Sequence, residues 1–123
     1  MFGYQLILDI FDCDVDSLRD EAVIREFLNV LLYKIKMKKM AEPTFIYLPD
    51  DNDYYVEKDI VGFTVFQGIE TSSITIHFCE GSRTAYFDLF SCKCFDQDVV
   101  IDLFNEYFGG EIANQMFLSR NAR

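Results

Sequence analysis

Three residue types that can carry chemistry stand close together in the stretch from Gly68 to Cys92. His77 is the single histidine of the chain; Ser72 precedes it by five residues and Cys92 follows it by fifteen. A histidine can act as a general base, while a serine hydroxyl or a cysteine thiol can act as a nucleophile or a proton donor. The stretch is therefore a candidate catalytic site.

Two expected strands carry these residues. The run Ser73–Phe78 alternates apolar with polar residues, and the run Thr84–Cys92 is rich in aromatic side chains, so both are typical of β-strands. Glu80, Gly81 and Ser82 lie between the two runs and predict a hairpin turn. We expect the hairpin and the loop before it to bring the serine, the histidine and the cysteine near one another.

The residues around Ser72 offer neither a nucleophile elbow nor an oxyanion helix, which argues against a serine hydrolase. A bare cysteine–histidine pair is a weak signal for a thiol enzyme. A third reaction is self-processing, in which the serine hydroxyl attacks the preceding carbonyl and elimination from the resulting ester leaves a pyruvoyl group. His77 is suited to remove the serine α-proton, and the ketone would be the electron sink of a decarboxylase.

The composition and the net charge of the chain exclude several classes of protein and partner. Half of the 123 residues are hydrophobic, with thirteen Phe and seven Tyr, which predicts one folded domain over residues 1–123. The net charge of −10 argues against partners such as nucleic acid or an anionic membrane surface. The chain start lacks the basic region of a secretory signal, and no apolar run reaches membrane-spanning length, so we expect a cytoplasmic protein.

The four cysteines do not predict a metal site. Cys92 and Cys94 have C-x-C spacing, but no second cysteine pair or histidine pair accompanies them, as structural zinc sites require. Cys13 and Cys79 are isolated in the sequence. We therefore expect reduced thiols and no bound metal.

Hydrophobic periodicity and capping residues predict the other elements. Strands are expected at Tyr4–Phe11, Thr44–Leu48, Ile60–Ile69 and Ile112–Leu118, with an acidic loop at Pro49–Asp59 and a frayed tail after Leu118. Helices are expected from about Ser17 to about Met37, and from Asp96 to the pair Gly109-Gly110. This order predicts an α+β fold, a two-layer sandwich whose antiparallel or mixed sheet carries both helices on one face. The other face is rich in aromatic residues, which favours a covering subunit or substrate.

The hairpin resembles the core motif of the pyruvoyl-dependent S-adenosylmethionine decarboxylases of the short prokaryotic type. That family reads Glu-Ser-His-Leu-Thr-Ile-His, followed by a strand that ends Asp-Val-Phe-Thr-Cys. Here Thr71–His77 and Asp88–Cys92 match the two motifs without a gap between serine, histidine and cysteine. Gly62–Thr64 is similar to the family's Gly-Val-Ser, and the resemblance covers roughly the first hundred residues.

The resemblance implies a role for each matching residue. The bond between Thr71 and Ser72 would be cleaved, and Ser72 would become the pyruvoyl cofactor, which holds the substrate as a Schiff base. His77 would be the base in processing, Thr64 would stand where the family has a supporting hydroxyl, and Cys92 would reprotonate the substrate carbon. The family fold is an α/β sandwich that pairs into a homodimer. The implied reaction is decarboxylation of S-adenosylmethionine, which supplies aminopropyl groups for spermidine.

Three positions differ from the family pattern and leave two alternatives open. Thr71 replaces a glutamate, Ser73 replaces a histidine, and Glu80 lies one residue before the position of the glutamate that binds the ribose. A relative that decarboxylates arginine or ornithine would not need the ribose contact, and its cationic substrate would suit an acidic protein. Alternatively, a non-processing paralogue would serve as a partner or regulatory subunit.

Overall fold

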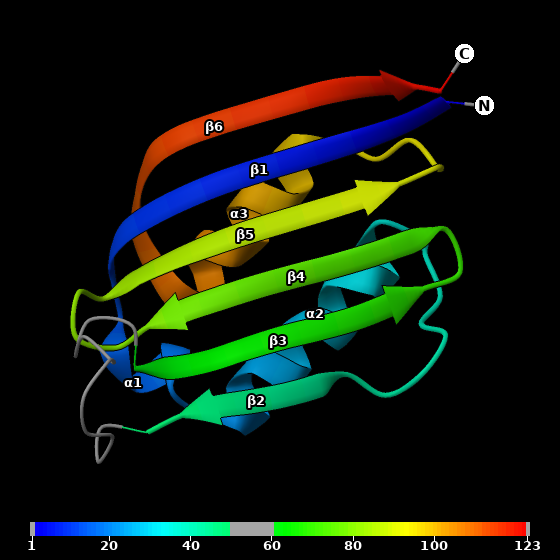
Figure 1. Cartoon of the computed structure of the whole chain (residues 1–123). Helices are drawn as coiled ribbons and strands as arrows, with labels where there is room; N and C mark the ends of the chain where they lie inside the picture. Colours follow the sequence, from blue (N-terminus) through cyan, green and yellow to red (C-terminus); the bar gives the residue numbers. More distant parts are fainter. Residues whose placement is uncertain (1, 50–60, 123) are drawn as a thin grey trace.

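A computed structural model describes residues 2–49 and 61–122, so the expected acidic loop lies almost wholly outside the described residues. The chain forms a six-stranded sheet in the order β2-β3-β4-β5-β1-β6, in which neighbouring strands are antiparallel. The helices cover one face of this sheet (Figure 1). The predicted α+β two-layer sandwich is confirmed, and its sheet is antiparallel.

The strands are longer at the two chain ends than the sequence predicts. Their bounds are β1 Phe2–Cys13, β2 Thr44–Leu48, β3 Gly62–Ile69, β4 Ser72–Cys79, β5 Thr84–Ser91 and β6 Gly109–Asn121. The prediction of a frayed tail after Leu118 is wrong, because β6 pairs with β1 as far as Asn121, which lies opposite Phe2. This pairing satisfies main-chain groups along the edge of β1 that would otherwise face solvent.

The first predicted helix is two helices, α1 (Val15–Leu18) and α2 (Glu21–Lys34). Asp20 separates them, because its side chain accepts hydrogen bonds from the main-chain N–H groups of Ala22 and Val23 and so caps α2. The second helix ends earlier than Met37 because Lys36 adopts the left-handed conformation, with φ of 59°.

The third helix, α3 (Gln97–Phe108), has the predicted caps. The Asp96 side chain accepts from the Asp98 N–H at its start, and Gly109 ends it with φ of 63°. Gly110 follows with φ of 92°, and a Cβ there would lie 2.7 Å from the carbonyl oxygen of Phe11. The glycine pair therefore lets the chain pass from α3 directly into β6, close against β1.

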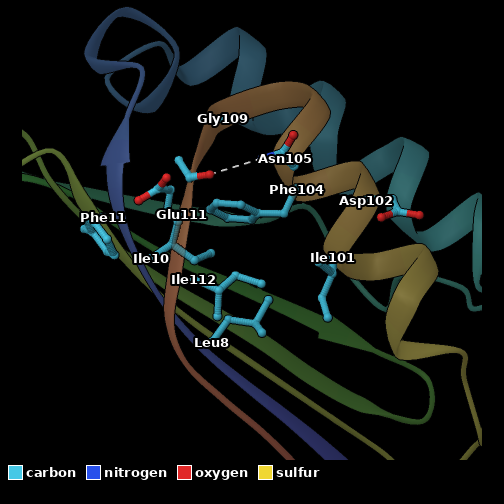
Figure 2. A pocket seen from close by; sticks show the side chains of 11 residues that line it. Leu8, Ile10, Phe11, Ile101, Asp102, Phe104, Asn105, Gly109, Glu111 and Ile112 are labelled. Atoms are coloured by element: carbon cyan, nitrogen blue, oxygen red, sulfur yellow. Dashed lines mark hydrogen bonds between the residues drawn. The ribbon is translucent and has the colours of Figure 1, made fainter.

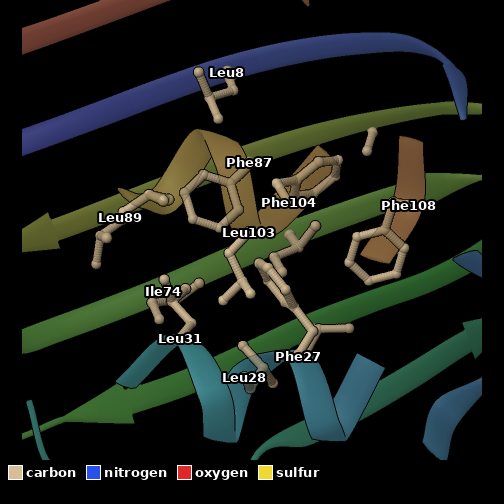
Figure 3. Packing of buried hydrophobic residues seen from close by; sticks show 14 of the residues in the cluster. Leu8, Phe27, Leu28, Leu31, Ile74, Phe87, Leu89, Leu103, Phe104 and Phe108 are labelled. Carbon is tan, nitrogen blue, oxygen red and sulfur yellow. The ribbon is translucent and has the colours of Figure 1, made fainter. Parts of the chain in front are cut away.

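The core lies between the sheet and the helices, and a group of phenylalanine rings packs among its aliphatic side chains (Figure 3). Phe27 of α2 packs edge-on against Phe87 of β5 and against Phe104 and Phe108 of α3, with centroid distances of 5.1–6.4 Å. These ring contacts pack β5, α2 and α3 together. Among the described helices, none has the length and apolar character needed to cross a membrane.

Candidate active site

The predicted cleavage point lies in the tight turn between β3 and β4. Ile69 and Ser72 pair across this turn, and Ser72 pairs on its other side with Ser91 at the end of β5. The Cys92 main-chain N–H donates a hydrogen bond of 3.0 Å to the Thr71 carbonyl oxygen. The carbonyl that is expected to be attacked is therefore held against the backbone of the expected proton donor, at the end of the sheet where both termini lie (Figure 1).

The side chain of Thr71 is also held on both sides. Its hydroxyl accepts a hydrogen bond of 2.8 Å from Ser91 Oγ and donates one of 3.6 Å to Met37 Sδ. Ser91 is fully buried, and its Oγ accepts from the Lys93 main-chain N–H at 3.0 Å. We call Thr71, Ser91 and Met37 the threonine clamp. The sequence analysis did not select Ser91, although a serine in phase with the apolar residues of a strand is a signal for a buried hydrogen bond.

His77 lies further along β4, paired with Thr64 of β3 and Tyr86 of β5. Its Nδ1 is 2.7 Å from the Thr64 hydroxyl oxygen, so the predicted supporting hydroxyl contacts the predicted base. Ile74 and Ile76 of the same strand are buried under the helices, whereas the alternating His77 belongs to the face that the helices leave open.

The expectation that one hairpin brings all three reactive residues together is only half right. Ser72 lies opposite Ser91, the residue before Cys92, but His77 lies five residues from Ser72, about 17 Å along an extended strand. The odd spacing also puts the two residues on opposite faces, and the register places Ser72 beside Ile69 and Ser91 on the helix-covered side. Sequence spacing alone hid this separation, because a strand extends its residues rather than gathering them.

Glu80 lies beyond the other end of β4, away from Ser72. It accepts a hydrogen bond of 2.7 Å from the Tyr47 hydroxyl, and its main-chain N–H donates to the Val61 carbonyl. Gly62 allows this approach, because its φ is 145° and a Cβ would overlap the Phe78 carbonyl oxygen. Within one chain, Glu80 therefore belongs to the same end of β4 as His77.

Cys92 lines a cavity of about 270 Å³ at the end of β1, β5 and β6. Its other lining residues are Phe2, Gly3, Phe90, Arg120, Asn121 and Ala122. The Arg120 guanidinium lies over the Phe90 ring at 4.8 Å and donates to Gln5 Oε1 at 3.0 Å. The sequence analysis missed Arg120 because it treated this segment as a frayed tail.

A second cavity, of about 560 Å³, lies between α3 and the start of β6 (Figure 2). Apolar side chains of both elements line it, including Ile101, Phe104 and Ile112. None of the predicted site residues lines this cavity. The cavity beside Cys92 is therefore the one that concerns the candidate site.

The four cysteines form no disulfide. Cys13 and Cys79 are buried, and burial, with the nearby Asp12 carboxylate as a smaller cause, raises the pKa of the Cys13 thiol to about 11. Cys92 and Cys94 are exposed. The described part of the chain holds no group of three or more side chains suited to bind a metal ion.

The sequence model of the S-adenosylmethionine decarboxylase family matches residues 4–121. The chain belongs to this family. The predicted resemblance is thus confirmed, and it extends past the first hundred residues into β6. The two alternatives from the sequence analysis, a decarboxylase of arginine or ornithine and a non-processing subunit, receive no support from this match.

The chain is also similar to individual members of the family. The S-adenosylmethionine decarboxylase proenzyme of Clostridium botulinum strain Langeland is 30% identical over 105 residues, which cover 85% of this chain and 81% of the relative. The proenzyme of the Loch Maree strain is 28% identical over the same length. The crystal structure of the adenosylmethionine decarboxylase from Aquifex aeolicus VF5 superposes with a TM-score of 0.70 at 16% identity, over 97% of this chain and 88% of that one. The structural likeness shows a shared fold.

Proposed function

We propose that the chain is a proenzyme that cleaves itself between Thr71 and Ser72, converts Ser72 to a pyruvoyl group, and decarboxylates S-adenosylmethionine for spermidine synthesis. Membership of the decarboxylase family supports this function, and the similar Clostridium proteins are named proenzymes. The observation that carries the proposal is the hydrogen bond from the Cys92 N–H to the Thr71 carbonyl oxygen.

That hydrogen bond favours the first step of self-cleavage. When Ser72 Oγ attacks the Thr71 carbonyl carbon, the carbonyl oxygen takes up negative charge, and a main-chain N–H at 3.0 Å stabilises it. Breaking the Thr71–Ser72 amide bond then leaves an ester. Loss of the Ser72 α-proton to a base expels the Thr71 carboxylate, and one water molecule hydrolyses the resulting enamine, which releases ammonia and leaves the ketone.

The residues around Ser72 fit the group that this reaction makes. The group is built from the atoms of Ser72 and remains at the start of β4, next to the backbone of Cys92. Once formed, its ketone supplies an electron sink for decarboxylation. The exposed Cys92, which lines the adjacent cavity, would hold the proton that the substrate carbon takes after carbon dioxide leaves. Such a thiol must stay reduced, which agrees with a cytoplasmic location.

A homodimer completes the proposal, because His77 of the same chain is about 17 Å from Ser72 along β4. We assign the base to His77 of a second copy, which would present this histidine from its own open face to the turn at Thr71–Ser72. That face exposes large apolar side chains, which water solvates poorly: Phe66, Tyr86, Met116 and Leu118. The Thr64 hydroxyl would orient the His77 ring in that dimer.

Denaturing mass spectrometry tests the proposal. The wild-type protein should yield residues 1–71 and 72–123, and the second fragment should be lighter than the plain peptide by one ammonia, with a ketone at its start. Ser72→Ala should remain one intact chain, whereas the matched control Ser73→Ala should still be cleaved. A wild-type chain that stays intact would overturn the proposal in favour of a non-processing subunit.

The substrate is tested separately on the cleaved protein. Release of carbon dioxide is compared for S-adenosylmethionine, arginine and ornithine, and Cys92→Ala serves as a control that should lose turnover. We expect release from S-adenosylmethionine alone. Release from arginine or ornithine would show that the substrate is a basic amino acid, and it would not contradict self-cleavage.

A further inference from the structure

We infer that the hydrogen bond between the Thr71 and Ser91 hydroxyls positions the scissile peptide for self-cleavage, which makes Thr71 and Ser91 positioning residues. This inference rests on the proposed function, because it concerns the same cleavage. It assigns a task to the side chains of the threonine clamp, which lie next to the reacting atoms and take no part in bond making.

The clamp acts on Thr71, whose carbonyl group must face the serine hydroxyl. Thr71 supplies the carbonyl that Ser72 attacks, and rotation of the Thr71 peptide would swing that carbonyl away from the serine hydroxyl. Two contacts prevent the rotation: the Cys92 N–H holds the carbonyl oxygen at 3.0 Å, and Ser91 Oγ holds the side-chain hydroxyl at 2.8 Å. The main chain and the side chain of Thr71 are thus both held by the neighbouring segment Ser91–Cys92.

Ser91 is placed to transmit this restraint. It is 0% exposed, and a hydroxyl at a buried strand position is costly unless it is hydrogen-bonded. Its Oγ accepts from the Lys93 N–H and donates to Thr71, so one buried hydroxyl joins the turn to the residues on both sides of Cys92. An apolar residue could fill the position, but it could not make this link.

The segment that follows α2 supports the turn from the other side. Met37 Sδ accepts from the Thr71 hydroxyl, and the Lys38 carbonyl accepts from the Glu70 N–H at 2.9 Å. The Met40 N–H donates to the Gly68 carbonyl at 3.0 Å. The turn therefore lies between two ordered segments, and the Thr71 side chain contacts both of them.

The test compares two substitutions of Thr71, one that removes the hydroxyl and one that keeps it. Thr71→Val keeps the branched shape and removes the hydroxyl, while Thr71→Ser keeps the hydroxyl. Each uncleaved chain is made by cell-free synthesis, and the cleaved fraction is followed over time by denaturing mass spectrometry. We expect Thr71→Val to cleave about tenfold more slowly than the wild type, the effect of losing one buried hydrogen bond, and Thr71→Ser to cleave at nearly the wild-type rate.

Ser91→Ala and Ser91→Thr repeat the comparison from the other partner. Ser91→Ala should be as slow as Thr71→Val, and Ser91→Thr should recover. The double variant Thr71→Val/Ser91→Ala should be little slower than either single variant, because the same Thr71–Ser91 bond is lost in all three. Circular dichroism and gel filtration select the folded monomer or dimer before each rate is measured. If one variant fails to fold, the variant of the other partner still measures the bond.

Hydroxylamine separates positioning from general loss of structure. It cleaves an accumulated ester, so it should release the fragments of His77→Ala, which is expected to stop after the acyl shift. It should not restore Thr71→Val, because the clamp acts before the ester forms. Equal rates for wild type and Thr71→Val, or rescue of Thr71→Val by hydroxylamine, would overturn the inference alone. A wild type that does not cleave would overturn both the proposed function and the inference.

Discussion

The two faces of the sheet divide the candidate site between them. On the helix-covered side, the proposed scissile bond between Thr71 and Ser72 lies beside the buried Ser91, and both the carbonyl and the hydroxyl of Thr71 are hydrogen-bonded. The open face carries His77 and Thr64 as a partly exposed pair among exposed apolar side chains. One chain therefore presents the proposed cleavage point and, elsewhere, the proposed base.

The proposed site can therefore be well ordered within one chain and still lack its base there. Packing within one chain suffices to fix the scissile peptide, because Thr71, Ser91 and Cys92 contact one another directly. The same packing cannot bring His77 to Ser72, because both belong to one extended strand. A second copy whose open face meets the turn at Thr71–Ser72 is the simplest way to join the two halves.

The largest expected effect is the complementation of two inactive chains. Ser72→Ala and His77→Ala should each fail to complete processing alone, since the first lacks the nucleophile and the second lacks the base. When the two are co-expressed, the Ser72→Ala chain supplies His77 to its partner. Mass spectrometry should then show completed cleavage of the His77→Ala chain only. Failure of the mixed dimer to process would place the base within the same chain.

Neighbouring residues of β5 should show the next largest difference, since they face opposite sides. Phe87 is 1% exposed and Tyr86 is 51% exposed. Phe87→Ala should lower the free energy of unfolding by about 3–5 kcal/mol, because it leaves a cavity among the core rings. Tyr86→Ala should change it by less than about 1 kcal/mol and should instead weaken dimer formation. Urea denaturation and sedimentation measure the two effects, and equal losses of stability would contradict the comparison.

The smallest effect is expected at the contact between Thr64 and His77. Thr64→Val removes the hydroxyl that lies 2.7 Å from Nδ1, so the ring should lose its fixed orientation. We expect completed cleavage to slow by up to about tenfold, the value of one hydrogen bond, without a matching loss of stability. Thr64→Ser is the control and should process at nearly the wild-type rate. If Thr64→Val is unaffected, the hydroxyl has no part in orienting the base.

Much of the fold could be predicted because its signals are local. Alternation along β4 correctly placed Ile74 and Ile76 in the core, and Asp96 and Gly109 correctly bounded α3. Predictions failed where a distant segment decides the structure. The end of β6 is a strand because β1 lies beside it, and nothing in the residues from Ser119 onward signals that partner.

The candidate site, too, could be predicted only where its signals lie close together in the sequence. The sequence supplied Ser72, His77 and Cys92 by type and spacing, because the resemblance to a family is carried by the order of residues along the chain. It could not supply Ser91 as a partner of Thr71, since the two residues lie twenty positions apart and meet only across paired strands.

The sequence by itself therefore determined the family and the α+β layout and supplied the candidate reactive residues, since each follows from residue types at short range. The tertiary structure decided which of them meet. Strand pairing brought Cys92 to the Thr71 carbonyl, and the extended geometry of β4 kept His77 away. The physical reason is that the register between strands sets contacts over long sequence separation, whereas spacing within a strand sets only distance and face.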